Sequence, residues 1–148
     1  MALTLLCDTS VLIPAMVHEH THHAKTFPLI QKILDKKLKG LVCAHSLAEC
    51  LSTLTKLGEP STPPSQAYEI IHQNIMNRFE VVELTTRDYD QAAKRVAERE
   101  RRGSAIYDSL ILQAALKRKV DCLITWDLKD FTQLAGNDLL IETPETYR

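Results

Sequence analysis

Four acidic residues lie where apolar segments end or where helices are expected to begin: Asp8, Glu49, Asp108 and Asp127. Asp8 directly follows the apolar segment 3–7, and Asp127 follows the apolar segment 120–125. No comparable set of basic residues accompanies them, and carboxylates held close together raise each other's pKa and cost stability. A bound divalent cation removes that cost. Oxygen ligands without His or Cys favour Mg²⁺ or Mn²⁺ over zinc.

Three of these acids also have a purely structural explanation. Ser46-Leu47-Ala48-Glu49 fits a capping box, in which Ser46 and Glu49 exchange hydrogen bonds at the start of a helix. Asp108 would be favoured near the positive end of its helix, and Asp127 would cap the turn that follows it. Each explanation covers one residue and leaves open why carboxylates should gather.

The elements that must position these acids alternate between strands and helices. Short apolar segments predict strands at 3–7, 41–44, 79–84 and 120–125, and a short fifth strand at 139–141. Helical patterns cover residues 9–17, 24–39, 45–57, 67–76, 86–102 and 104–116. Gly40 is expected to end the second of these helices, and residues 126–131 are expected to turn away from the fourth strand.

This alternation predicts an α/β fold with a mainly parallel sheet and helices on both faces. If the crossovers are right-handed and the chain reverses direction beside the first strand, the first and fourth strands become neighbours. Asp8 and Asp127 then flank the crevice at the carboxyl ends of the strands, which is where such sheets bind ligands.

Composition limits the class of protein. A chain of 148 residues with 45% apolar and 25% charged residues fits one globular domain and excludes a disordered chain. We expect a cytoplasmic protein without membrane contact, because no apolar run is long enough to span a bilayer and no signal sequence is visible. The four cysteines lack CxxC spacing, which favours buried thiols. A net charge of −1 excludes nonspecific coating of nucleic acid, so any such contact must depend on local basic patches.

Four segments together resemble a known family. Asp8-Thr9-Ser10-Val11-Leu12-Ile13, Ser46 to Glu49, Tyr107-Asp108-Ser109-Leu110-Ile111 and Leu123-Ile124-Thr125-Trp126-Asp127 are similar to the signature segments of PIN domains. Within that family the chain most resembles the VapC-type ribonuclease toxins of prokaryotic toxin–antitoxin pairs. The resemblance implies a three-layer α/β/α fold over a single domain, residues 1–148, with a parallel sheet of four to five strands in the order 3-2-1-4-5.

The resemblance also implies a metal-dependent endoribonuclease. Asp8, Glu49, Asp108 and Asp127 match the acids that hold one or two Mg²⁺ or Mn²⁺ ions in similar proteins. Ser10 matches a residue that helps hold the metal's water shell, and Thr125 matches a hydroxyl beside the fourth acid. Asp130 is interpreted as a supporting or helix-capping residue. Glu49 or Asp108 could orient or deprotonate the attacking water, and the sequence does not separate that role from metal ligation.

Single-stranded or loop RNA is the expected substrate, because the cleaved strand must enter the crevice. Candidate phosphate contacts are Arg99, Arg101, Arg102 and Lys129, although the arginines also fit a solvated helix end. Expected partners are an antitoxin and a second copy of the chain. The homodimer would use either Tyr68, Ile71 and Ile75 or the face near Phe27 and Ile30. The cluster His18–His23 is a possible zinc or nickel site, with partner contact or simple solvation favoured.

Three other classes compete with this hypothesis. A noncatalytic, receiver-like regulatory module would place an acceptor Asp after the third strand, where Glu83-Leu84-Thr85 supplies none. A phosphatase of the haloacid dehalogenase type would need an Asp at the position that Ser10 occupies. A catalytically silent PIN fold remains open, although it would not need all four acids.

Overall fold

Five parallel strands form the centre of the protein, which a computed structural model describes over residues 2–147. The strands are β1 (Thr4–Cys7), β2 (Lys39–Cys43), β3 (Glu80–Val82), β4 (Cys122–Ile124) and β5 (Ile141–Glu142). Their order is β3-β2-β1-β4-β5, and every neighbouring pair is parallel. The predicted order is confirmed. A receiver-like fold is excluded, because its strands follow the order 2-1-3-4-5.

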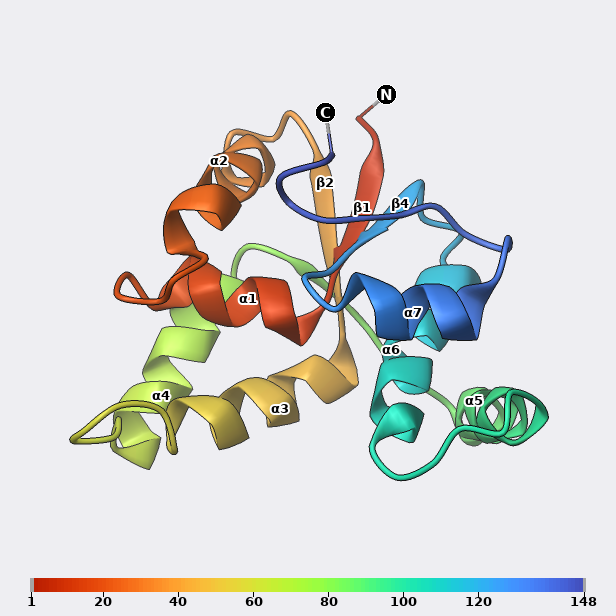
Figure 1. Ribbon diagram of the computed structural model, residues 1–148. Helices are drawn as coiled ribbons and strands as arrows, with labels where there is room; N and C mark the ends of the chain where they lie inside the picture. The colour runs from red at the N-terminus through yellow and green to blue at the C-terminus, as the bar shows by residue number, and fades with distance from the viewer. Residues whose placement is uncertain (1, 148) are drawn as a thin grey trace.

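Helices cover both faces of this sheet (Figure 1). On one side lie α1 (Thr9–Met16), α2 (His23–Leu34), α3 (Ala44–Leu54), α4 (Pro64–Ile71) and the π-helical turn η1 (His72–Met76). On the other side lie α6 (Ala105–Lys117) and α7 (Leu128–Ala135), with α5 (Thr86–Glu98) packed against α6. Across residues 2–147, none of these helices combines the length and apolar character needed to cross a membrane.

The first strand, β1, contributes side chains to the apolar cores on both faces of the sheet. Leu5 and Cys7 face the cluster formed with α1 to α4, whereas Leu6 faces the cluster formed with α6 and α7. All three side chains have no exposed surface. A strand buried on both faces must be apolar at every position, which explains the unbroken apolar run before Asp8. The four cysteines are buried and free, as predicted.

Gly40 does not end a helix, contrary to the sequence prediction. Helix α2 already ends at Leu34, and Lys36 takes the left-handed conformation, with φ of 60°, that a glycine at a helix end would normally adopt. Gly40 instead lies inside β2, where a Cβ atom would approach the Phe79 ring to 2.7 Å. The close packing of Phe79 against the strand therefore explains the glycine.

The segment after β4 also differs from the prediction. The sequence indicated only a turn at 126–131, but α7 begins at Leu128 and ends before Gly136, whose φ is 58°. The fifth strand is Ile141–Glu142 rather than 139–141. Helix α7 fixes the direction in which the chain leaves Asp127.

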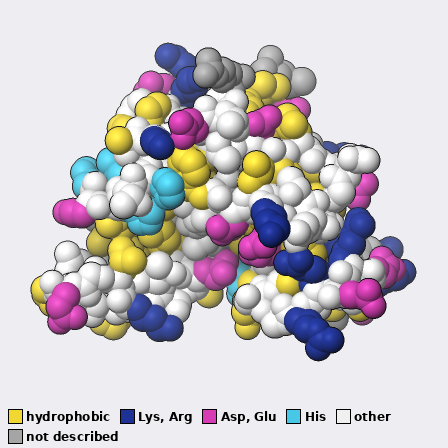
Figure 2. Space-filling model, viewed as in Figure 1, with side chains coloured by type: hydrophobic (Ala, Val, Ile, Leu, Met, Phe, Trp, Pro, Cys, Tyr) yellow, Lys and Arg dark blue, Asp and Glu magenta, His cyan; other side chains and the backbone are white. Residues whose placement is uncertain are grey.

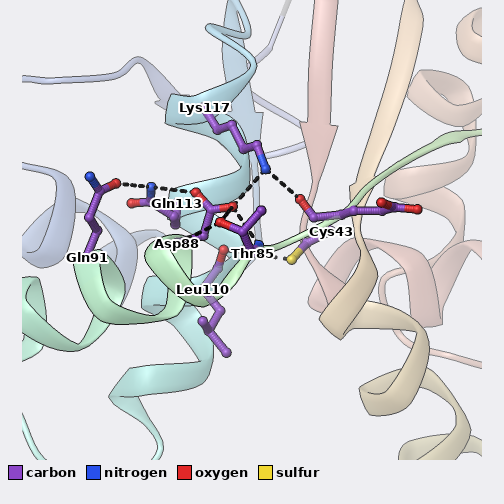
Figure 3. A network of polar contacts seen from close by, with 8 residues as sticks. Cys43, Thr85, Asp88, Gln91, Leu110, Gln113 and Lys117 are labelled. Carbon is purple, nitrogen blue, oxygen red and sulfur yellow. Dashed lines mark hydrogen bonds and ion pairs between the residues drawn. The ribbon is translucent and has the colours of Figure 1, made fainter.

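A polar network joins α5 to α6 (Figure 3). Thr85 and Asp88 form a capping box at the start of α5. The Asp88 carboxylate accepts a hydrogen bond of 2.7 Å from Lys117 Nζ, and Lys117 also donates to the Glu83 carbonyl. Gln113 donates to both Asp88 and Gln91. The network therefore holds α6, the helix that carries Asp108, against α5.

We expect Lys117→Met to lower the free energy of unfolding by about 2 kcal/mol, because it leaves the nearly buried Asp88 carboxylate without its cation. The Lys117 ammonium lowers the pKa of Asp88 well below its usual range. The stabilisation is therefore present above pH ~4 and is lost as the pH falls further and Asp88 takes a proton. Urea unfolding of both proteins across this pH range measures the effect.

Lys94→Met is the matched control, since Lys94 pairs with Glu98 at 3.9 Å on an exposed face of α5. It should cost less than about 0.5 kcal/mol. Equal losses in the two variants would show that the Lys117–Asp88 pair does not clamp α6.

Candidate active site

The Asp8 carboxylate is held in one position by three hydrogen bonds at the junction of β1 and α1. Oδ1 accepts from the Thr9 N–H at 2.7 Å. Oδ2 accepts from the hydroxyls of Ser10 and Thr125, each at 2.8 Å. The Asp8 N–H donates to the Ile124 carbonyl, which continues the pairing of β1 with β4. Asp8 is only 2% exposed, so these bonds fix its orientation as well as its position.

The two hydroxyls are themselves oriented by backbone N–H groups. Ser10 Oγ accepts from the Trp126 N–H, and Thr125 Oγ1 accepts from the Asp127 N–H, both at 2.9 Å. Each hydroxyl therefore has its single proton left for Asp8. The arrangement ties the start of α1 to the end of β4. Ser10 and Thr125, which were named as supporting residues, thus contact Asp8 directly.

All four predicted acids line one open pocket of about 430 Å³. Asp8 and Asp127 come from the ends of β1 and β4, Glu49 from α3, and Asp108 from the first turn of α6. The Thr9 hydroxyl donates to Glu49 Oε1 at 2.9 Å and so positions this carboxylate beside α1. Figure 2 shows acidic side chains gathered in a hollow at the centre of this face.

The structural explanation for Glu49 is wrong. Helix α3 begins at Ala44, two residues before the expected cap, and its N-terminus has no side-chain capping bond. The Ser46 hydroxyl is buried, and among the described residues 2–147 it has no hydrogen-bond partner. Asp127 likewise makes no capping hydrogen bond to α7. Both carboxylates are therefore free of the helix-capping roles considered above.

The electrostatics of the pocket favour protonated or neutralised carboxyl groups. Burial, with a contribution from Asp127, raises the pKa of Asp8 to about 6. Burial and the charges of Asp8 and Asp127 raise the pKa of Asp108 to about 7. Burial and Asp130 raise the pKa of Asp127. Within residues 2–147, none of the ion pairs includes Asp8, Asp108 or Asp127.

The donor chemistry of this pocket fits a hard divalent cation, since it offers carboxylate oxygens without a paired Lys or Arg. Across the described part of the chain, no three His, Cys, Asp or Glu side chains are arranged as a ready-made metal site. Mg²⁺ retains several waters and is commonly held by only one or two carboxylates. The residues therefore suit a partly hydrated Mg²⁺ or Mn²⁺ ion better than a fully enclosed one.

The remaining predicted site residues lie outside the pocket lining. Asp130 is exposed and pairs with Arg101 at 3.6 Å. Arg101 also donates to Gln133. Arg99, Arg102 and Lys129 are exposed. Figure 2 shows basic side chains along one side of the acidic hollow.

Three aromatic side chains of the pocket were not predicted. His20, His22 and Trp126 line it together with the acids. The His22 and Trp126 rings are stacked, with centroids 4.3 Å apart and planes 13° apart. Trp126 Nε1 donates to the buried Thr26 hydroxyl at 3.0 Å. The position of Trp126 between Thr125 and Asp127 could have indicated that it lies in the pocket. The two histidines gave no such indication, because they lie in an irregular turn.

Comparisons with known proteins agree with this fold. The family model of the PIN domain matches residues 5–137. Ribonuclease VapC27 of Mycobacterium tuberculosis is 30% identical over 119 residues, which cover 79% of this chain and 80% of the relative. The chain therefore belongs to the PIN-domain family and, within it, is VapC-like. The predicted resemblance is confirmed.

Solved structures show the same fold at low sequence identity. The M. tuberculosis toxin VapC20, which cleaves the sarcin–ricin loop, superposes with a TM-score of 0.70 at 16% identity over 89% of this chain and 95% of that one. VapBC2 of Rickettsia felis, bound to a DNA fragment from its promoter, gives a TM-score of 0.67 at 17% identity over 95% and 98% of the two chains.

The raised pKa values of the pocket predict how stability depends on pH in EDTA. The stability gained from the protonated acids is fully present below pH ~4 and is lost as the pH rises through about 6 for Asp8 and about 7 for Asp108. The melting temperature should therefore fall between pH ~5 and pH ~8, and Asp108→Asn should make that fall smaller. Asp90→Asn, on an exposed face of α5, should follow the wild type. The same pH slope in all three proteins would contradict the electrostatic account.

Proposed function

We propose that the protein is a Mg²⁺- or Mn²⁺-dependent endoribonuclease that acts as the toxin of a toxin–antitoxin pair in the cytoplasm, as a single PIN domain. The observation that carries the proposal is the pocket lined by Asp8, Glu49, Asp108 and Asp127 in a PIN-family chain. The name of the 30% identical relative, a ribonuclease, supports the reaction class.

The four acids would hold one or two ions. A bound ion supplies positive charge to the phosphate and lowers the pKa of a coordinated water. Asp8 is held by Ser10 and Thr125 in a fixed orientation, which suits a ligand that must not move. Asp108 or Glu49 would take the proton of the attacking water. Thr9 would keep Glu49 in place for either role.

Single-stranded or loop RNA is the substrate class that we propose. The sarcin–ricin loop cleaved by VapC20 is an example of such a target for a protein of the same fold. The exposed side chains of Arg99, Arg102 and Lys129, with Arg101 partly exposed, would contact phosphates beyond the acids. No side chain needs to form a covalent bond to RNA in this proposal.

Cleavage assays test the proposal directly. The purified protein should cleave RNA with Mg²⁺ or Mn²⁺ and should lose activity in excess EDTA. Asp8→Asn and Asp108→Asn should each lower the rate by about 100-fold or more, since each removes a charge worth several kcal/mol to the transition state. Circular dichroism of the variants checks that the fold is retained.

Asp90→Asn is the matched control, because it removes an exposed carboxylate outside the pocket and should cleave RNA like the wild type. Undiminished cleavage by both pocket variants, or by the wild type in EDTA, would refute the assignment. A wild-type protein that binds Mn²⁺ and never cleaves RNA would instead be a catalytically silent PIN fold.

An antitoxin is the partner that we propose, in agreement with the VapBC toxin–antitoxin structures of similar fold. A groove of about 670 Å³, partly lined by Val17, Leu54 and Leu57, adjoins the acidic pocket and shares Leu57 and His20 with it. An apolar antitoxin segment lying there would place a basic side chain among the carboxylates. Such a segment would occupy the active site.

We also propose a homodimer that forms through exposed apolar side chains. Ile30, Ile71 and Ile75, which the sequence suggested as contacts, are buried within the chain itself. Tyr68 and Phe27 keep exposed apolar surface and are available to a second copy.

Expression in a bacterial host checks the toxin proposal. The wild type expressed alone should stop growth, whereas Asp8→Asn should not, because growth arrest requires RNA cleavage. Co-expression of a cognate antitoxin should restore growth. Growth arrest by Asp8→Asn at equal protein level would show that toxicity does not come from the acidic pocket.

A further inference from the structure

Two stacked aromatic pairs line two pockets that meet at Glu49. The first pair is His22 with Trp126, inside the acidic pocket. The second is His45 with Tyr107, whose ring centroids lie 5.0 Å apart with planes 12° apart. The second pair lines an adjoining pocket of about 350 Å³. Glu49 and Thr53 line both pockets, so the two hollows meet at a carboxylate of the site.

Each pair is attached directly to a proposed catalytic acid. Trp126 precedes Asp127, and Tyr107 precedes Asp108. His45 lies one helical turn before Glu49, with Nε2 4.0 Å from Oε1. A displacement of either aromatic pair would therefore move a neighbouring carboxylate. A ligand that contacts both pairs would pass Glu49, which lines both pockets.

The first pair is held by hydrogen bonds, and both pairs keep some exposed surface. The Trp126 backbone N–H donates to Ser10, and its indole N–H donates to Thr26, so the ring has no free polar group to satisfy. Its partner His22 is half-buried. Tyr107 is 46% exposed although it stacks on His45, so part of its ring remains open to another group.

A nucleobase is the ligand group that these surfaces fit best. Every base has a neutral aromatic face, so it stacks on a side-chain ring without being repelled by the nearby carboxylates. Bases inside a duplex have their faces covered by their neighbours, whereas unpaired bases are free to stack on protein. Two platforms in pockets that meet at Glu49 match two nucleotides joined by one phosphate.

We propose that the His22–Trp126 and His45–Tyr107 pairs are base-stacking subsites for the two unpaired nucleotides on either side of the cleaved phosphate. The inference rests on the proposed ribonuclease function and adds to it the part of the substrate that the enzyme recognises. It predicts sequence-tolerant binding that requires unpaired bases at both positions.

The only tryptophan of the chain provides a binding readout that does not depend on cleavage. In EDTA, a short unpaired RNA strand of mixed sequence should change the fluorescence of Trp126 in a saturable way. A strand of equal length and charge that lacks its bases should change it far less, and so should a fully paired RNA duplex. Equal changes with intact and abasic strands would show that only phosphates bind.

Tyr107→Ala tests the second subsite by kinetics. It should raise KM for an unpaired RNA about 10-fold and change kcat less, because base stacking contributes mainly to binding. Tyr107→Phe keeps the ring and should behave like the wild type. Tyr89→Ala is the matched control, since Tyr89 is 48% exposed, close to the 46% of Tyr107, and lines neither pocket.

The outcomes separate this inference from the proposed function. A wild-type protein that does not cleave RNA, yet whose Trp126 fluorescence still responds to unpaired bases, would refute the ribonuclease while showing that the His22–Trp126 pair binds bases. An active enzyme in which Tyr107→Ala keeps the wild-type KM would refute the subsites alone. A fluorescence change with the antitoxin but none with RNA would assign the pairs to protein contact and overturn the inference.

Discussion

The hydrogen bonds to the Asp8 carboxylate are the interaction on which the rest of the site depends. Ser10 lies at the start of α1, and Thr125 directly follows β4. Both hydroxyls donate to the same oxygen of the Asp8 carboxylate. Each hydroxyl is turned toward Asp8 by a backbone N–H of the segment after β4. The same bonds therefore orient a proposed metal ligand and fix where Trp126 and Asp127 leave the sheet.

The carboxylates around Asp8 work against the stability of the protein in the absence of a cation. Burial and mutual repulsion raise the pKa values of Asp8 and Asp108 into the range of about 6 to 7. The protein can fold despite this electrostatic cost because its two apolar cores lie away from the pocket, on the two faces of β1 and its neighbouring strands. Asp88 shows the contrasting case, in which a lysine holds a nearly buried carboxylate in its charged form. A pocket whose acids lack such a lysine is suited to a metal ion.

The positions of Asp8 and Asp127 could be predicted from sequence because they depend on topology alone. Parallel strands place their carboxyl ends at one edge, and apolar runs reveal those strands. Glu49 was harder, because the Ser46 motif imitates a capping box and only the start of α3 at Ala44 shows that the box is absent. The histidines at 20 and 22 were not predictable, since a short irregular turn with no periodicity brings them to the pocket.

The acids at the carboxyl edge of the sheet are proposed to bind a divalent cation. Anomalous X-ray diffraction from crystals soaked in Mn²⁺ measures this most directly, because the ion itself gives the signal. We expect a peak in the acidic pocket, within bonding distance of a carboxylate oxygen of Asp8, that is lost in Asp8→Asn. A map without a peak in that pocket, or with a peak only at His18–His23, would contradict it.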